Sequence, residues 1–195
     1  WATAYYGMFY NWVLKVGNTC ARTPVTAVVD SKATKCSSGQ TISLTKGWNL
    51  ISFNVIPTNT AISSVFAGLG SNLQTIKTAD GFYTPSQSAF MNSLTNIEVG
   101  KAYLVFVSAS TSVTVNGIPT GNLSFPLKKG WNMMGYPMQS NSSINTAFSN
   151  ISSQIITVKN FDGFWQPASS TNSLINLEPG KGYFINVLND CNISW

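Results

Sequence analysis

The feature that most constrains this chain is an internal duplication. Four blocks of sequence recur in the same order, and the distance between matching positions drifts only from 83 residues (Leu44 to Leu127) to 80 residues (Tyr103 to Tyr183). The matching blocks are 44–50 with 127–133, 62–66 with 144–148, 76–83 with 158–165, and 92–103 with 172–183. A repeat of this period predicts two copies of one folding unit. We therefore expect an N-terminal arm over 1–40, a first module over 41–122 and a second module over 123–195.

The pattern within one copy predicts mostly strands. Short alternating or apolar runs bounded by turn residues are typical of strands, and Asp-Gly favours a tight hairpin with positive φ at both positions. Apolar residues at helical spacing after Asn59 and Thr60, either of which can cap a helix, predict one short helix that ends near Gly68. The expected strands are 42–44, 48–53, the two arms of a hairpin over 75–84, 102–107 and 111–115. The predicted fold class is mainly β (β-rich α+β), with two tandem homologous β modules, one short helix in each, and a strand-like N-terminal arm.

The residue types that both copies share are Gly, Trp, Asn, Asp-Gly, Glu, Gly-Lys and Tyr. One interpretation makes them a ligand site. The other makes them structural, because two copies of one fold must keep the same turns and the same large core residues. We favour the structural interpretation, with glycines at turns and Trp48 and Trp131 as core anchors.

Three segments also carry a family resemblance: Gly-Trp-Asn-Leu-Ile-Ser at 47–52, Asp-Gly-Phe-Tyr at 80–83, and Glu-Val-Gly-Lys-Ala-Tyr at 98–103. Together they resemble a repeat that is common in large secreted and cell-surface proteins of bacteria. The resemblance covers about three quarters of the chain, in two copies. It implies an extracytoplasmic β-rich module, and it brings no catalytic residues with it.

The composition points to the same compartment. Charged residues make up 9% of the chain, against about 25% in typical soluble domains, and Ser, Thr and Asn take their place. We therefore predict an extracellular or cell-surface protein. Because the chain starts at Trp1, we expect a processed product or a fragment, and no apolar stretch is long enough to predict a membrane span.

Three cysteines are consistent with an oxidising compartment. Cys20 and Cys36 flank a short polar loop and are the better candidates for a disulfide, although pairing of either with Cys191 stays open. If Cys20 and Cys36 pair, Cys191 is left as a free thiol or as a link to another chain.

The residue inventory argues against catalysis. The chain has no histidine and only six carboxylates, which removes His-dependent nucleophilic sites and the usual zinc ligand sets. The net charge of +5 comes from cations spread along the chain, and Arg22 is the only arginine. We therefore predict no enzyme, no metal, no cofactor and no nucleic-acid partner.

The N-terminal arm is unusually aromatic, with Trp1, Tyr5, Tyr6, Phe9, Tyr10 and Trp12 in its first part. Three fates are open: the arm packs on its own repeats, stacks on sugars, or adds as a strand to a neighbouring subunit. The first functional hypothesis is a self-assembling subunit of a filament, pilus-like fibre or surface layer, whose partners are copies of itself or other surface proteins. The alternative is a carbohydrate-binding or adhesive module, with Phe82, Tyr83, Phe164 and Trp165 as rings that stack on glycans.

Overall fold

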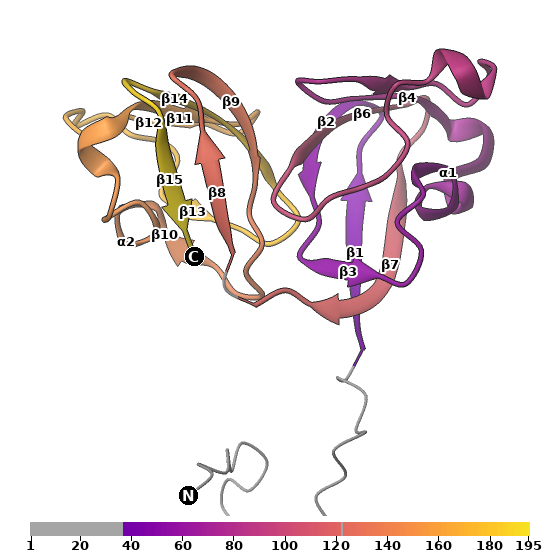
Figure 1. Cartoon of the computed structure of the whole chain (residues 1–195), viewed down its shortest axis with the longest axis horizontal. Coiled ribbons are helices and arrows are strands. Elements are labelled where there is room, and N and C mark those ends of the chain that lie inside the picture. Colours follow the sequence, from indigo (N-terminus) through magenta and orange to yellow (C-terminus); the bar gives the residue numbers. More distant parts are fainter. Residues whose placement is uncertain (1–36, 122) are drawn as a thin grey trace, which may run out of the picture. The chain divides into compact units, whose positions relative to one another are not determined.

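The computed structural model describes residues 37–121 and 123–195, which belong to one compact unit. This unit is mainly β, with several antiparallel sheets and only short helices, as the sequence predicted. The first module contains the elements β1 to β7, and the second contains β8 to β15 (Figure 1).

The first module has two sheets. Their strands are β1 (Ser38–Leu44), β2 (Gly47–Ser52), β3 (Val55–Pro57), β4 (Leu73–Lys77), β5 (Phe82–Tyr83), β6 (Ala102–Val107) and β7 (Thr111–Pro119). The strand orders are β1-β7-β3 and β2-β6-β4-β5, all antiparallel. The helical elements are α1 (Ile62–Val65), η1 (Ala67–Asn72) and η2 (Ala89–Met91).

The strands β1 and β2 follow one another closely but do not pair with each other. β1 pairs with β7, whereas β2 pairs with β6. The chain therefore passes from one sheet to the other at Thr45 and Lys46, and it crosses again between β2 and β3, between β3 and β4, and between β6 and β7. These four crossings enclose a core between the two sheets, as in a small sandwich.

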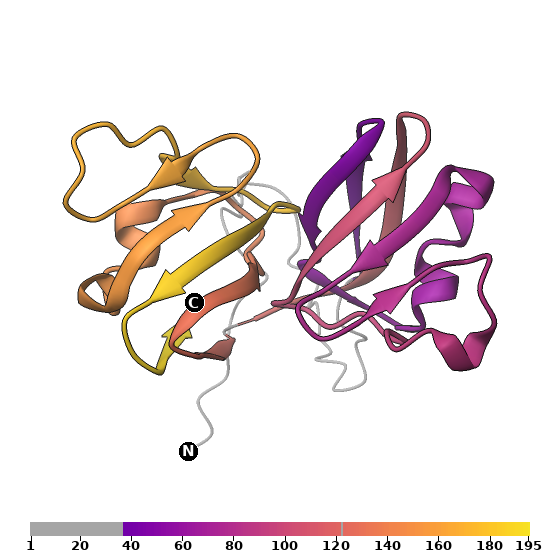
Figure 2. The ribbon, with the colours of Figure 1, turned by 90° about the horizontal axis from the view of Figure 1, so that it is seen from above.

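The second module repeats this arrangement. Its strands are β8 (Ser124–Leu127), β9 (Gly130–Gly135), β10 (Ser142–Ser143), β11 (Ile155–Lys159), β12 (Phe164–Trp165), β13 (Asn176–Leu177), β14 (Gly182–Val187) and β15 (Cys191–Ser194), and its helices are α2 (Ile144–Ala147) and η3 (Ser152–Gln154). The sheets have the orders β15-β8, β12-β11-β14-β9 and β10-β13. Figure 2 shows the two modules from above.

Each module has its own hydrophobic core. In the first, the ring of Phe53 packs against those of Phe66 and Tyr103, with centroids 5.9 and 5.8 Å away. In the second, Phe148 packs against Trp165 at 6.2 Å and is fully buried. Since Phe66 and Phe148 occupy equivalent repeat positions, the duplication reproduces the interior as well as the strands.

Two details of the local structure differ from the sequence predictions. The hairpin at Asp80-Gly81 has a four-residue loop, because Lys77 pairs with Phe82, and Gly81 is not among the glycines with positive φ. The hydroxyl of Thr78 instead accepts hydrogen bonds from the N–H groups of Asp80 and Gly81 and supports the loop from inside. The helix α1 is one turn long, with Ala61 as its N-cap, and the chain continues in the 3₁₀ helix η1.

The prediction that Trp48 and Trp131 anchor the cores is wrong. Their side chains are 42% and 53% exposed. Side chains alternate between the faces of a strand, so Trp48 lies on the face of β2 opposite Ile51, and Ile51 belongs to the buried core. Both copies therefore have a partly exposed tryptophan at this position.

Two buried tyrosines fasten the Glu-x-Gly-Lys turns to the cores. The hydroxyl of Tyr103 accepts a hydrogen bond from the N–H of Glu98 at 2.6 Å and donates one to the Glu98 carbonyl at 3.2 Å. The hydroxyl of Tyr183 accepts one from the N–H of Glu178 at 2.8 Å. Burial raises the pKa of Tyr103 to about 12, against the partial opposing effect of its hydrogen bond with the Glu98 backbone, and burial also raises the pKa of Tyr183.

We expect these tyrosines to make the fold sensitive to alkali. Their usual pKa is 10.0, and the folded value is higher, so the stability due to their neutral form is complete below pH 10 and is lost as the pH rises toward the folded pKa. For Tyr103 the loss between pH 10 and 12 amounts to about 3 kcal/mol. Urea unfolding between pH 9 and 12 measures it. The Tyr103→Phe variant should show a shallower fall, and an equal slope in this variant would refute the assignment, because the two proteins differ only in the Tyr103 hydroxyl.

Candidate binding grooves

The two modules meet through equivalent residues. The N–H of Ser52 donates to the Gly180 carbonyl at 2.9 Å, and the N–H of Gly135 donates to the Gly100 carbonyl at 2.7 Å. Ser52 and Gly135 are equivalent repeat positions, as are Gly100 and Gly180. The contact is therefore related to itself by an approximate twofold axis, as in a symmetric dimer.

Further contacts obey the same symmetry. Antiparallel bridges join Ile51 to Lys181 and Met134 to Lys101, which are again equivalent pairs. Gly100, at φ +89°, receives the ring of Phe125, which would lie 1.5 Å from a Cβ added there. The equivalent Gly180, at φ +86°, faces Ile42. Each glycine gives its turn the positive φ that it needs and leaves room for the other module.

At the equivalent positions closest to the axis, one module has a side chain and the other has glycine. A Cβ on Gly135 would lie 2.7 Å from the Cβ of Ser52, and a Cβ on Gly182 would lie 2.8 Å from that of Ala102. The single hydroxyl of Ser52 donates to the Lys181 carbonyl at 2.6 Å and accepts from the N–H of Tyr136 at 3.2 Å. If both copies carried a side chain at these positions, the two side chains would occupy the same space. The glycine in one copy therefore permits the close approach of the two modules.

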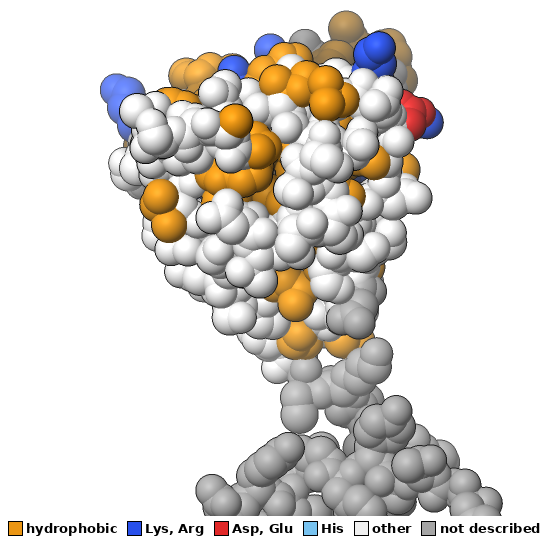
Figure 3. Space-filling view, turned by 90° about the vertical axis from the view of Figure 1, so that its left-hand side faces the viewer, with side chains coloured by type: hydrophobic (Ala, Val, Ile, Leu, Met, Phe, Trp, Pro, Cys, Tyr) orange, Lys and Arg blue, Asp and Glu red, His pale blue; other side chains and the backbone are white. Residues whose placement is uncertain are grey.

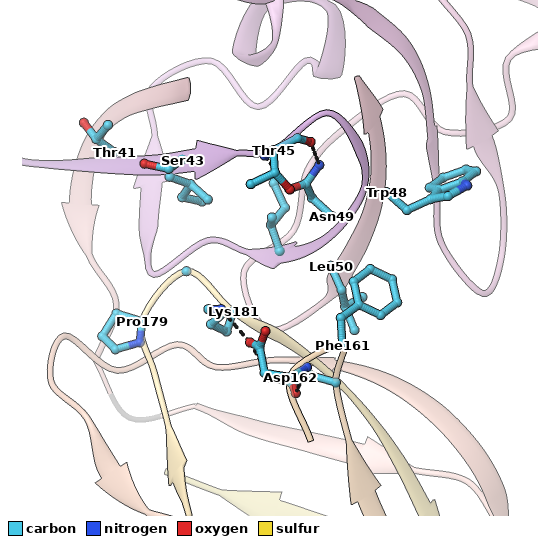
Figure 4. A pocket seen from close by; sticks show the side chains of 14 residues that line it. Thr41, Ser43, Thr45, Trp48, Asn49, Leu50, Phe161, Asp162, Pro179 and Lys181 are labelled. Carbon is cyan, nitrogen blue, oxygen red and sulfur yellow. Dashed lines mark hydrogen bonds and ion pairs between the residues drawn. The ribbon is translucent and has the colours of Figure 1, made fainter. Parts of the chain in front are cut away.

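Two equivalent grooves lie on either side of this contact. Groove 1, of about 470 Å³, lies between the β1–β2 corner of the first module and the 160–162 and 179–181 loops of the second (Figure 4). Groove 2, of about 350 Å³, lies between the β8–β9 corner and the equivalent loops, 78–80 and 100–101. The duplicated Trp-Asn, Asp-Gly and Gly-Lys motifs, which are far apart within one copy, converge here from different copies.

The charged side chains that both copies share form ion pairs at the grooves. In groove 1, the Lys181 ammonium lies 2.7 Å from the Asp162 carboxylate. In groove 2, Lys101 lies 3.0 Å from Glu98 and 3.9 Å from Asp80. These pairs are exposed, so each contributes at most about 1 kcal/mol to stability.

The asparagines that both copies share, Asn49 and Asn132, have a structural role at the corners. The side chain of Asn49 accepts a hydrogen bond from the N–H of Thr45 at 2.9 Å and donates one to the Thr45 carbonyl at 2.8 Å. Asn132 makes the same pair of bonds with Lys128, at 2.9 and 2.7 Å. Each amide satisfies the backbone N–H and C=O of the residue that directly follows β1 or β8.

A lysine ammonium lies over the ring of each of the two exposed tryptophans. The Lys77 ammonium lies 5.5 Å from the ring centre of Trp48, and that of Lys159 lies 4.6 Å from the ring centre of Trp131, both within cation–π range. Trp48 also contacts Phe106, with ring centroids 5.1 Å apart. Part of each tryptophan surface is thus already occupied by the chain itself.

The four rings that we considered for glycan stacking have different environments. Phe82 and Phe164 are equivalent and partly exposed, and Tyr83 is half-buried. Trp165 is only 5% exposed, and its indole N–H donates to the Asn145 side chain at 3.1 Å. Its ring is part of the second core and offers no face to a sugar.

The other candidate residues are only partly described. The thiol of Cys191 is half-buried against the second core, and burial, reinforced by Asp190, raises its pKa, which favours the protonated and less reactive form. Cys191 forms no disulfide within the described residues. Cys20, Cys36 and the aromatic arm with Trp1, Tyr5, Tyr6, Phe9, Tyr10 and Trp12 lie outside the described residues.

Residues 37–121 and 123–195 contain no cluster of three or more His, Cys, Asp or Glu side chains that would hold a metal ion. No helix in this part of the chain has the length and apolar character that crossing a membrane requires. Sequence reasoning missed the grooves because their walls come from different copies. The signal that could have indicated them is the set of differences between the copies at equivalent positions, such as Ser52 and Gly135.

Comparisons with known proteins add no relative to this picture. The resemblance of 47–52 and its companion segments to a bacterial surface repeat therefore stays a prediction. A scan against models of protein families, and searches of curated proteins and of solved structures, found no match to this chain.

Proposed function

We propose that this chain is a non-enzymatic, extracellular structural protein that associates with copies of itself in a filament, pilus-like fibre or surface layer. The observation that supports this most is that two exposed aromatic side chains, Trp48 and Phe161, line the same groove, because contiguous exposed apolar surface is typical of interaction sites. The large apolar side chains exposed on the described surface are Trp48, Ile56, Phe82, Phe90, Met91, Ile118, Trp131, Ile156, Phe161, Phe164, Ile175 and Leu188. Figure 3 shows apolar patches among polar side chains on one face.

The low charge of the surface favours the same function. The described carboxylates of both grooves are paired with lysines, so copies of the chain can approach without strong repulsion between these groups. Phe161, which is 58% exposed, lies on the wall of groove 1 and offers an apolar contact beside the neutral pair. These features suit association through apolar contact and backbone hydrogen bonds more than through ion pairing.

The test is the oligomeric state of the full chain. We expect sedimentation velocity to show oligomers that grow with concentration, and electron micrographs to show ordered particles. The Phe161→Ser variant should weaken association at least tenfold, because it removes apolar area from a groove wall. The matched control is Phe90→Ser, which alters a ring that is 89% exposed and lines neither groove. A chain that stays monomeric at high concentration contradicts the proposal.

The alternative is a carbohydrate-binding or adhesive module. It is favoured by the partly exposed rings of Phe82 and Phe164, which occupy equivalent positions and would give two similar contacts for a repeating polymer. A glycan array distinguishes this function: binding that is lost in Phe82→Ala and Phe164→Ala supports it, and an array without any binding removes it.

A further inference from the structure

The strand β1 has an edge that no described strand covers. In the sheet order β1-β7-β3, β1 is the outermost strand. Its residues Thr41 and Ser43 are exposed and line groove 1 (Figure 4). Backbone N–H and C=O groups on an open edge can pair with another strand.

The register of β1 with β7 shows which N–H and C=O groups of β1 point away from β7, toward the uncovered edge. In an antiparallel pair, residues alternate between hydrogen-bonded positions and non-hydrogen-bonded positions, and side chains lie closer together at the latter. The hydroxyls of Thr41 and Thr114 are 3.0 Å apart, and those of the equivalent Ser124 and Ser194 are 3.2 Å apart. Thr41, and with it Ser43 two residues later, therefore direct N–H and C=O away from β7.

The second copy supports this assignment through a proline. Pro126 in β8 is equivalent to Ser43 and pairs with Asn192. Proline has no N–H, so within a sheet it takes positions whose N–H would face away from the partner strand. The open edge in groove 2 thus lacks the donor that Ser43 supplies in groove 1.

The corner asparagine shows that this edge accepts pairing. Thr45 has the same orientation as Ser43, and both its N–H and its C=O are bonded by the Asn49 side-chain amide. The amide does there what a peptide group of an added strand would do. The Asn49 side chain occupies the edge at Thr45. A strand added along β1 would therefore pair next with the peptide groups of Ser43 and then of Thr41.

We propose that groove 1 is an acceptor site for an added β-strand, that its occupant is the aromatic segment 1–16 of a second copy of this chain, and that Pro126 closes groove 2 to the same segment. The proposal rests on self-association as the function. Residues 1–14 contain no charged side chain and four of the chain's tyrosines and tryptophans within 5–12, which suits a groove whose only ion pair is internally neutral and whose walls include Phe161 and Pro179.

The length of the connection permits exchange between copies. About twenty residues separate this segment from residue 37, where the described structure starts. An extended chain spans up to about 3.3–3.6 Å per residue, so this connection reaches on the order of 70 Å. That distance exceeds what is needed to leave one small domain and enter the groove of the next.

The test measures binding of a labelled synthetic peptide, with the sequence of residues 1–16, to the full chain by fluorescence anisotropy. At chain concentrations below those at which oligomers form, where no neighbouring copy fills groove 1, we expect one peptide per chain. Ser43→Pro should weaken binding at least tenfold by removing the edge donor, and it should fold, because Pro126 occupies the equivalent position in the native chain. The matched control Ser43→Ala keeps the N–H and should bind as the wild type does. Pro126→Ser should raise the stoichiometry toward two.

The outcomes separate this site from the function. If the full chain assembles but Ser43→Pro binds peptide as tightly as Ser43→Ala, the acceptor site is refuted and self-association stands. If the chain is monomeric and the peptide still binds in a Ser43-dependent manner, the site stands and the assembly is refuted. A monomer that binds no peptide, as when each segment occupies its own groove, overturns the proposal of exchange between copies.

Discussion

Replacing Gly135 by valine should destabilise the protein by about 3 kcal/mol or more and disrupt the contact between the modules. A Cβ at this position would lie 2.5 Å from the Lys101 carbonyl oxygen and 2.7 Å from the Ser52 Cβ. Backbone atoms cannot move aside without breaking the neighbouring hydrogen bond from the Gly135 N–H to the Gly100 carbonyl. Overpacking usually costs about 1–3 kcal/mol, and here the strain falls on two backbones. Urea unfolding measures the loss, and a change below 1 kcal/mol would contradict the described contact.

Because Ser52 and Gly135 are related by the approximate twofold axis, exchanging them provides a control for the Gly135 substitution. Exchanging the two residues in the double variant Ser52→Gly with Gly135→Ser moves the side chain to the other side of the axis. The new hydroxyl would then face the Lys101 carbonyl, as that of Ser52 faces the Lys181 carbonyl. We expect the double variant to be more stable than Gly135→Ser alone, so the two substitutions should be strongly non-additive in a double-mutant cycle. Additive effects would mean that the two positions do not share one space.

The second large effect is expected from Phe148→Ala, which should lower the free energy of unfolding by about 3–5 kcal/mol. The ring is fully buried and packs against Trp165 at 6.2 Å and Trp195 at 5.9 Å. The two tryptophans are held by other elements and cannot fill the space that the ring leaves, so the cavity term adds to the lost burial.

The equivalent residue in the first core and an exposed ring serve as comparisons. Phe66→Ala should cost a similar amount, because Phe66 is also buried and packs on Phe53 at 5.9 Å. Phe161→Ala changes an exposed ring and should alter stability by less than about 0.5 kcal/mol. Denaturant titrations of the three variants check this ranking. If Phe148→Ala and Phe161→Ala cost the same, the division into core and surface is wrong.

The mainly β architecture could be predicted from the sequence because its signals are local. The apolar run at 102–107, the alternation in 111–115 and the Gly-Lys turns each report on a few neighbouring residues, and each lies in the predicted type of structure. The pairing of strands was less accessible. β1 and β2 look like a hairpin along the chain, yet they enter different sheets, because the choice of partner depends on strands about sixty residues further on.

The candidate site was harder to predict than the fold, for two reasons. Trp48 and Trp131 were assigned to the cores because tryptophan is large and apolar, whereas the alternation along β2 places Trp48 on the face opposite Ile51. The grooves join motifs from different copies, such as the β1–β2 corner with Asp162 and Lys181. A repeat comparison shows what two copies share, but it gives no information on how they pack.

The proline in β8 has a consequence for the connectivity of any assembly. A subunit with two open acceptor grooves and one donor segment could bind two neighbours through its grooves. The assembly could then branch into a network of undefined size. Blocking one acceptor leaves a valency of one donor and one acceptor, which generates unbranched, head-to-tail chains with a defined direction. Under the proposed exchange, Pro126 would therefore be the difference between the two copies that gives an assembly its direction.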